Sequence, residues 1–169
     1  MDEHRVGLKP ILRKVWAKRG KRPVAVIRPR YKWLYIASFV HPESGRSSWW
    51  MVPHLDKEIF AGLLGAFAAE YAQAARLLVV LDGAGWHKGV SLPGNVELIF
   101  LPPYSPELQP AEHLWVLADE VLVNRWFTTL DALQELLAPH LVRLSHRTQQ
   151  IRALTLFHWW PTAPRPSPN

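Results

Sequence analysis

The 169-residue sequence contains no cysteine, which excludes disulfide bonds and thiolate metal sites. No apolar stretch approaches the roughly 18 residues of a membrane span, and no charged, apolar and small-residue leader opens the chain, so we expect neither insertion nor export. Internal repeats are also absent, which argues against repeat architectures. A protein without disulfides fits a reducing cytoplasm.

The composition that remains is typical of one compact domain. The chain is 49% hydrophobic, and a domain of this length can bury a substantial core. We expect the domain to cover residues 1–160. The end of the chain, PTAPRPSPN at 161–169, is rich in proline and is expected to be disordered.

Positive charge is concentrated near the start of the chain. Residues 1–33 contain eleven lysines and arginines and two acids, whereas the net charge of the whole chain is +6. The cations alternate with tryptophan and tyrosine, a composition that suits phosphate contacts and base stacking, although a solvated face is an equally good explanation. Nearness in the sequence to Asp2, an acid to which the resemblance described below assigns a role, favours DNA. Three of the cations are interpreted as DNA contacts: Arg19, Lys21 and Arg22.

The apolar periodicity predicts a mixed α/β fold. Strands are expected at 24–27, 33–40, 46–52, 77–81 and 96–101. One helix is expected from an Asp56 N-cap to about residue 75, another from about Pro110, and a third after an N-cap at Thr129 or Asp131. The segment 143–160 is expected to close the domain.

The most informative segment is LPPYSPELQPAE at 101–112. It follows VELIFL at 96–101, a short apolar run typical of a buried strand, and its four prolines delay regular structure until a helix can begin. Pro110 suits the first turn of that helix, and Glu112 follows it by two residues. The sequence therefore predicts a carboxylate held at a helix start just after a strand.

A second carboxylate ends the preceding apolar run. Asp82 follows LLVVL at 77–81 and precedes the tripeptide GAG, as expected where a strand opens into a loop. Because sites in open α/β sheets form at the carboxyl ends of strands, Asp82 and Glu112 can converge there. Taken singly, each acid has an ordinary structural explanation, as a turn former and as a partner of the helix dipole.

Four motifs in order along the chain resemble the catalytic domain of bacterial mariner-superfamily insertion-sequence transposases: DEHRVGL at 2–8, WAKRGKRP at 16–23, LDGAGWHKG at 81–89 and LPPYSPELQPAEHLW at 101–115. These transposases are DDE enzymes with an RNase H-like fold, a mixed sheet flanked by helices. The resemblance extends from Asp2 to about Trp160, and the proline-rich motif is its most specific part. The sequence departs from the family at Gln109, where asparagine is usual.

The resemblance implies three catalytic acids, Asp2, Asp82 and Glu112, which would ligate two Mg²⁺ or Mn²⁺ ions. Two divalent ions roughly 4 Å apart can activate a nucleophile, neutralise the phosphate and stabilise the leaving oxygen, and carboxylate oxygens suit such ions. His87 and Lys88 follow Asp82 in the glycine-containing loop. We expect both to contact phosphate, although a loop histidine is usually only solvated.

The resemblance also implies an activity. A transposase of this family hydrolyses a phosphodiester at the element end and joins the freed 3′ hydroxyl to target DNA. The implied partners are inverted-repeat DNA, target DNA and a second copy of the chain, in the cytoplasm at the nucleoid. Two alternatives remain: a catalytically inactive remnant that only binds or regulates DNA, and a host RNase H-like nuclease.

One departure concerns the first acid. In the family this acid ends a central strand, whereas only Met1 precedes Asp2 here. We therefore expect the sheet to lack its first central strand, with Asp2 at a frayed terminus.

Overall fold

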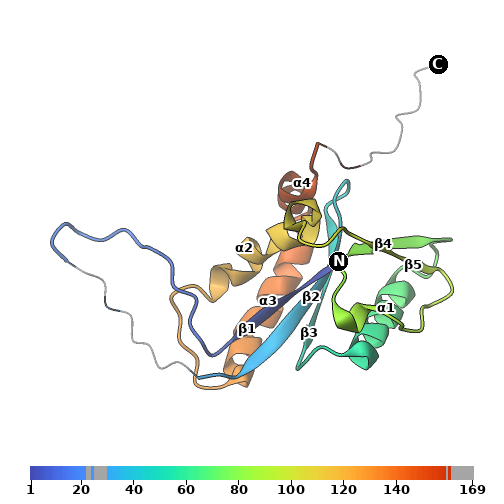
Figure 1. The fold of residues 1–169 in the computed structure, drawn as a ribbon. Coiled ribbons are helices and arrows are strands. Elements are labelled where there is room, and N and C mark those ends of the chain that lie inside the picture. The colour runs from blue at the N-terminus through green and yellow to red at the C-terminus, as the bar shows by residue number, and fades with distance from the viewer. Residues whose placement is uncertain (22–23, 25–29, 159, 161–169) are drawn as a thin grey trace, which may run out of the picture.

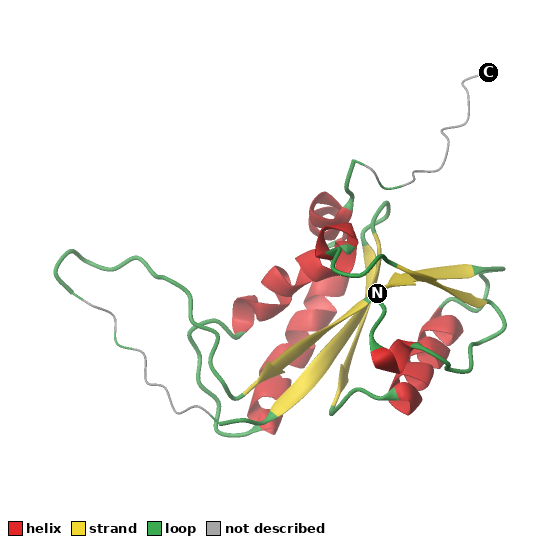
Figure 2. Ribbon diagram, in the orientation of Figure 1, coloured by secondary structure: helices red, strands yellow, loops and turns green. Residues whose placement is uncertain are grey.

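The computed structural model describes residues 1–21, 24, 30–158 and 160, and it contains two sheets that diverge from the region of the N-terminus (Figures 1 and 2). The first sheet is antiparallel with the order β1-β2-β3, and the second is a parallel pair, β4-β5. The strands are β1 (Asp2–Gly7), β2 (Trp33–His41), β3 (Arg46–Val52), β4 (Leu77–Leu81) and β5 (Val96–Phe100). Four of the expected strands are thus confirmed, and the one expected at 24–27 lies outside the described residues except for Val24.

The expected helix caps are confirmed where they can be tested. Asp56 accepts a hydrogen bond from the backbone of Ile59 at 2.8 Å, and Thr129 accepts one from Ala132 at 3.2 Å, so each side chain satisfies a free N–H of a first turn. The helical elements among the described residues are α1 (Lys57–Glu70), η1 (Gly85–His87), η2 (Pro106–Leu108), η3 (Pro110–Leu114), α2 (Trp115–Ala118), η4 (Asp119–Val121), α3 (Leu130–Ser145) and α4 (Thr148–Thr155), where η marks a 3-10 turn.

Two helices differ from the expectation. The first ends at Glu70 and not near residue 75, because the chain turns there to enter β4. The helix expected from Pro110 is broken into η3, α2 and η4, so Glu112 lies on a 3-10 turn. Pro110 does occupy the first turn, as expected. Single-turn pieces let Trp115 and Leu122 reach the same core from a short stretch of chain.

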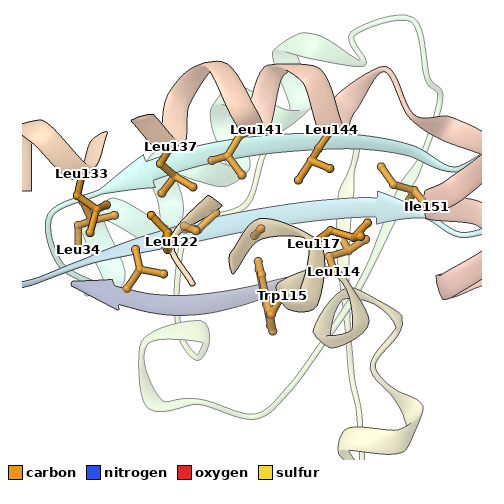
Figure 3. Packing of buried hydrophobic residues seen from close by; sticks show 13 residues of the cluster. Leu34, Leu114, Trp115, Leu117, Leu122, Leu133, Leu137, Leu141, Leu144 and Ile151 are labelled. Atoms are coloured by element: carbon orange, nitrogen blue, oxygen red, sulfur yellow. The ribbon is translucent and has the colours of Figure 1, made fainter. Parts of the chain in front are cut away.

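Helices cover both faces of the first sheet, because β2 is apolar on both sides. Leu34 and Ile36 point into a core formed with α2, α3 and α4, which Figure 3 shows at close range. Ala37 and Phe39 point the other way, into a second core formed with α1, β4 and β5. A fully buried leucine or phenylalanine contributes about 1.5–3 kcal/mol to stability, so each layer is held chiefly by apolar burial.

The sequence predicted no strand at residues 2–7, but the structure has one there, β1, which begins at Asp2. β1 pairs with β2 from Asp2 opposite Ser38 to Gly7 opposite Trp33. Asp2 is the first residue of this ladder and not a frayed end. Met1 anchors it, because the Met1 side chain is buried in the second core and its amino group donates to the carbonyl of Val80 at 2.7 Å.

No helix within the described ranges is long and apolar enough to cross a bilayer.

Candidate functional site

The ends of two parallel strands define one edge of the candidate site. β4 and β5 pair in parallel register from Leu77 opposite Val96 to Leu81 opposite Phe100. Asp82 is the residue that follows β4, so it leaves the sheet at the same edge where the chain continues from β5 toward Glu112. This placement is the one that the sequence predicted.

The start of β1 brings Asp2 to this edge. The hydrogen bond between the Met1 amino group and the Val80 carbonyl lays the beginning of β1 beside the end of β4. Asp2 directly follows Met1, and Asp82 lies two residues after Val80. Both acids are therefore within two residues of the pair that this hydrogen bond joins. The carboxylates of Asp2 and Asp82 both act electrostatically on the Met1 ammonium.

Two hydrogen bonds tie the Glu112 segment to the same place. The side-chain amide of Gln109, the position that departs from the family, donates to the Met1 carbonyl at 2.7 Å. The indole Nε1 of Trp115 donates to Oδ2 of Asp2 at 2.9 Å. Glu112 precedes Trp115 by three residues, a spacing that puts both side chains on one face of a helical turn. Glu112 itself is exposed, three residues before the tryptophan that holds Asp2.

Burial makes Asp2 electrostatically unusual. Desolvation raises the pKa of its carboxyl group from 3.8 to about 6, against the opposing effects of the Trp115 hydrogen bond and the Met1 ammonium. Burial also lowers the pKa of the Met1 amino group from 8.0 to about 6. A partly buried carboxylate with a raised pKa is a candidate functional group, because a structural site gains little from a charge that is costly to desolvate.

The second acid makes local contacts through a buried histidine. The Asp82 side chain, 60% exposed, accepts a hydrogen bond from the Ala84 backbone at 3.1 Å and lies 2.9 Å from Nδ1 of His87. The other ring nitrogen of His87 lies 2.9 Å from Oε1 of Glu3. Burial alone would lower the pKa of His87, but the hydrogen bond and charge of Glu3, helped by Asp82, outweigh burial and raise it.

These contacts correct the interpretation of His87 as a phosphate ligand. Its side chain is only 1% exposed, and both ring nitrogens already have partners, so phosphate cannot reach it in this structure. Glu3 was not identified from the sequence as a site residue. The position of Glu3 next to Asp2 could have indicated its role. Adjacent residues of a strand point to opposite faces, so Glu3 contacts a different layer of the fold from Asp2.

The three acids fit a divalent ion in chemical type and in the placement of their backbones. They offer only hard oxygen ligands, which Mg²⁺ and Mn²⁺ prefer. Their side chains are not gathered, however, since the described residues contain no group of three or more His, Cys, Asp or Glu side chains arranged to hold a metal ion. Asp82 is turned toward Ala84 and His87, and Asp2 is held by Trp115.

The expected cationic residues lie in two different places. Lys88 is exposed beside the site, and a Cβ added at Gly83 would lie 3.8 Å from its ammonium group. Arg19 and Lys21 are exposed in the long loop between β1 and β2, which begins at the end of β1 opposite to Asp2 (Figure 1), while Arg22 lies outside the described residues. Nearness in sequence to the first acid therefore does not place this loop beside the acids.

Comparisons with known proteins agree with this arrangement. A family model described as DDE superfamily endonuclease matches residues 1–134. A relative from Sinorhizobium fredii (strain NBRC 101917 / NGR234), the uncharacterized protein y4pE/y4sA, is 36% identical over 102 residues, which make up 59% of this chain and 76% of that protein.

Solved structures of Mos1 share the fold. The Mos1 transposase paired-end complex with left transposon end has a TM-score of 0.57 at 17% identity, over 90% of this chain and 53% of that chain. The mariner Mos1 paired end complex with Mg has a TM-score of 0.54 at 15% identity, over 89% and 53%. The chain thus spans about half the length of these proteins. The likeness confirms the expected RNase H-like fold.

Proposed function

The chain belongs to the DDE superfamily endonucleases, and from this membership we propose that it is the catalytic domain of a DNA transposase. In this proposal it hydrolyses a phosphodiester at the element end and then directs the freed 3′ hydroxyl onto target DNA. The observation that carries the proposal is the meeting of β1, β4 and the continuous η3–α2 segment through the Met1–Val80 and Trp115–Asp2 hydrogen bonds. These contacts bring together the three segments that carry the acids.

Each acid has a role that its position supports. Asp2, Asp82 and Glu112 supply carboxylate oxygens for two Mg²⁺ or Mn²⁺ ions, which when bound activate the nucleophile and stabilise the leaving oxygen. Trp115 orients the Asp2 carboxylate through its indole N–H. Lys88, exposed beside Gly83, offers positive charge to the phosphate backbone of the substrate.

The proposed partners are the inverted repeats of the element, target DNA and a second copy of the chain. Support comes from the structural neighbours, which include a paired-end complex with a transposon end and the Mos1 Strand Transfer Complex. Arg19, Lys21 and Arg22 of the basic loop are proposed to contact DNA away from the acids. Because its substrate is DNA, we infer that the protein acts at the nucleoid.

A second candidate function is DNA binding without catalysis. The observation that favours it is the scattered arrangement of the acids in the described residues, with Asp82 turned toward Ala84 and His87 and not toward Asp2. A copy whose acids cannot gather would still present its basic surface to DNA and could regulate an active transposase.

Cleavage of the inverted-repeat DNA that flanks the coding region, measured with and without Mg²⁺, tests both candidates. Asp82→Asn and Glu112→Gln are expected to abolish cleavage while changing DNA affinity by less than about twofold, because they remove ligand oxygens and not phosphate contacts. Asp131→Asn and Glu135→Gln on α3 are matched controls and are expected to cut like the parent chain.

Three results would contradict parts of this proposal. Undiminished cleavage by either site variant would remove that acid from the mechanism. A parallel loss of affinity would assign it a binding role. Specific DNA binding by a parent chain that never cleaves would favour the regulatory candidate.

A further inference from the structure

Glu3 is a buried acid that supplies neither a ligand nor a charge to the proposed reaction. Its side chain is 5% exposed, and its Oε1 lies 2.9 Å from Nε2 of the fully buried His87. Two such groups are costly to remove from water, and a buried ion pair often contributes no more to stability than apolar side chains of similar volume. A role other than stabilisation is therefore expected for this pair.

The imidazole ring of His87 is held in place by its neighbours. The Phe60 ring of α1 lies 4.5 Å away and the Trp86 ring packs edge-on at 5.7 Å, both measured between ring centroids. The second ring nitrogen, Nδ1, lies 2.9 Å from Oδ1 of Asp82 and 3.1 Å from the Asp82 carbonyl oxygen. One fixed ring therefore contacts Glu3 through one nitrogen and both the side chain and the backbone of Asp82 through the other.

The Asp82 carboxylate depends on such a support, because it lies beyond the end of β4 in a loop that contains two glycines. The carboxylate is mostly exposed and accepts the backbone N–H of Ala84 at 3.1 Å. Ala84 belongs to the same loop and moves with it, whereas His87 is tied to β1 through Glu3. A ligand for a metal ion must be held to within about 0.5 Å of its working position by the residues around it.

We propose that Glu3 and His87 are positioning residues for Asp82, through which β1 sets the place of the second acid relative to the first. The inference rests on the proposed function, in which Asp2 and Asp82 both supply ligands to the divalent ions. Asp2 and Glu3 are adjacent in β1 and point to opposite faces of the strand. A shift of β1 therefore moves the Asp2 carboxylate directly and the Asp82 carboxylate through Glu3 and His87, so the distance between the two acids is preserved.

This role requires the length of the side chain at Glu3 and not its charge. A glutamine has the same reach, and its amide N–H can donate to Nε2 of His87, which leaves the Nδ1 hydrogen for Asp82. An aspartate keeps the charge but is one methylene shorter, so it does not reach the ring. Positioning by contact and attraction by charge thus predict opposite results for the two substitutions.

The test compares three variants of the complete chain with the parent: Glu3→Gln, Glu3→Asp and the double variant Glu3→Leu, His87→Phe. The double variant replaces the buried pair by apolar side chains of similar volume, which avoids leaving one buried charge without its partner. Glu135→Asp is the matched control, because it shortens an exposed glutamate on α3 by the same methylene.

Three quantities are measured for each protein. The three-bond couplings between Hα and Hβ of Asp82, recorded by NMR in EDTA, show whether its χ1 angle stays in one rotamer. The affinity for Mn²⁺ alone is measured by electron paramagnetic resonance of the free ion. Thermal unfolding in EDTA shows whether the fold is retained.

The parent chain, Glu135→Asp and Glu3→Gln are expected to keep Asp82 in one rotamer and to agree in Mn²⁺ affinity within about threefold. Glu3→Asp and the double variant are expected to average the Asp82 couplings and to bind Mn²⁺ at least about tenfold more weakly, as is usual when a group that orients a metal ligand is lost. The melting temperature of the double variant is expected to equal or exceed that of the parent chain. A purely structural role would not produce weaker binding in a protein of undiminished stability.

Three results would overturn the proposal. The first is averaged Asp82 couplings in the parent chain, or unchanged couplings in both Glu3→Asp and the double variant. The second is a loss in Glu3→Gln with parent-like behaviour of Glu3→Asp, which would assign the role to charge. The third is a double variant whose Mn²⁺ affinity falls only together with its melting temperature. A parent chain that binds no Mn²⁺ would contradict the proposed function instead, while the couplings in EDTA would still decide the role of Glu3 and His87.

Discussion

Asp2→Asn is expected to stabilise the protein at neutral pH, because the structure holds the Asp2 carboxylate where ionisation is unfavourable. Its pKa is raised from 3.8 to about 6, chiefly by burial. Between these two values the folded state binds more protons than the unfolded state, so stability falls as the pH rises through this window. Asparagine keeps an oxygen that can accept the Trp115 N–H but carries no charge.

The magnitude follows from the size of the shift. A shift of about two pKa units corresponds to about 2.7 kcal/mol at 1.36 kcal/mol per unit. Asp2 is only partly buried, so we reduce the expected gain to about 1–2 kcal/mol. For a domain of this size, that gain raises the melting temperature by about 3–6 °C.

The assay is thermal or urea unfolding in EDTA at pH 7.5 and pH 4. The gain is expected at pH 7.5 and should nearly vanish at pH 4, where the folded Asp2 is already protonated. Asp131→Asn, an exposed acid on α3, is the control and is expected to show no comparable gain at either pH. A variant less stable than the parent at pH 7.5, or a gain of equal size at both pH values, would refute the reasoning.

Three further outcomes are expected. Replacing Arg19, Lys21 and Arg22 with alanine should weaken binding to all DNA sequences. The slope of the logarithm of affinity against the logarithm of salt concentration should flatten by about 0.9 for each phosphate that is no longer neutralised. An unchanged slope, measured by fluorescence anisotropy, would contradict this prediction. Gly45→Ala should lower the unfolding free energy by more than about 2 kcal/mol in urea titrations, because Gly45 has φ +69° and a Cβ there would lie 1.9 Å from a carbonyl oxygen. Leu137→Ala should cost about 2–5 kcal/mol in the same assay, since it empties part of the first core; a cost below about 1 kcal/mol would show that this core is loosely packed.

The features that sequence predicted well are those decided by neighbouring residues. The run LLVVL formed β4 and left Asp82 at its end, and Asp56 and Thr129 capped the helices that follow them. Pro110 opened a helical turn with Glu112 in it. In each case the signal and the structure lie within a few residues of each other, so no distant contact was needed to interpret it.

The features that sequence missed depend on distant contacts. Asp2 is ordered by a bond from Met1 to Val80 and by the indole of Trp115, far along the chain. His87 is buried, and its second ring nitrogen hydrogen-bonds to the carboxylate of Glu3, 84 residues away in sequence. A single sequence carries no record of such partners, and so a histidine in a glycine-containing loop suggested an open phosphate ligand.

The alternation of side chains along β1 gives two adjacent acids separate duties. Asp2 and His4 face α2, where one bonds to Trp115 and the other stacks on it, whereas Glu3 faces η1 and holds His87 against Asp82. The Asp2–Glu3 dipeptide therefore joins two layers of the fold, and the order of the two acids decides which layer each one contacts. Exchanging Asp2 and Glu3 would keep every charge in the chain. It would, however, put the longer glutamate side chain beside Trp115 and leave an aspartate too short to reach His87. Both acids would therefore lose their hydrogen bonds.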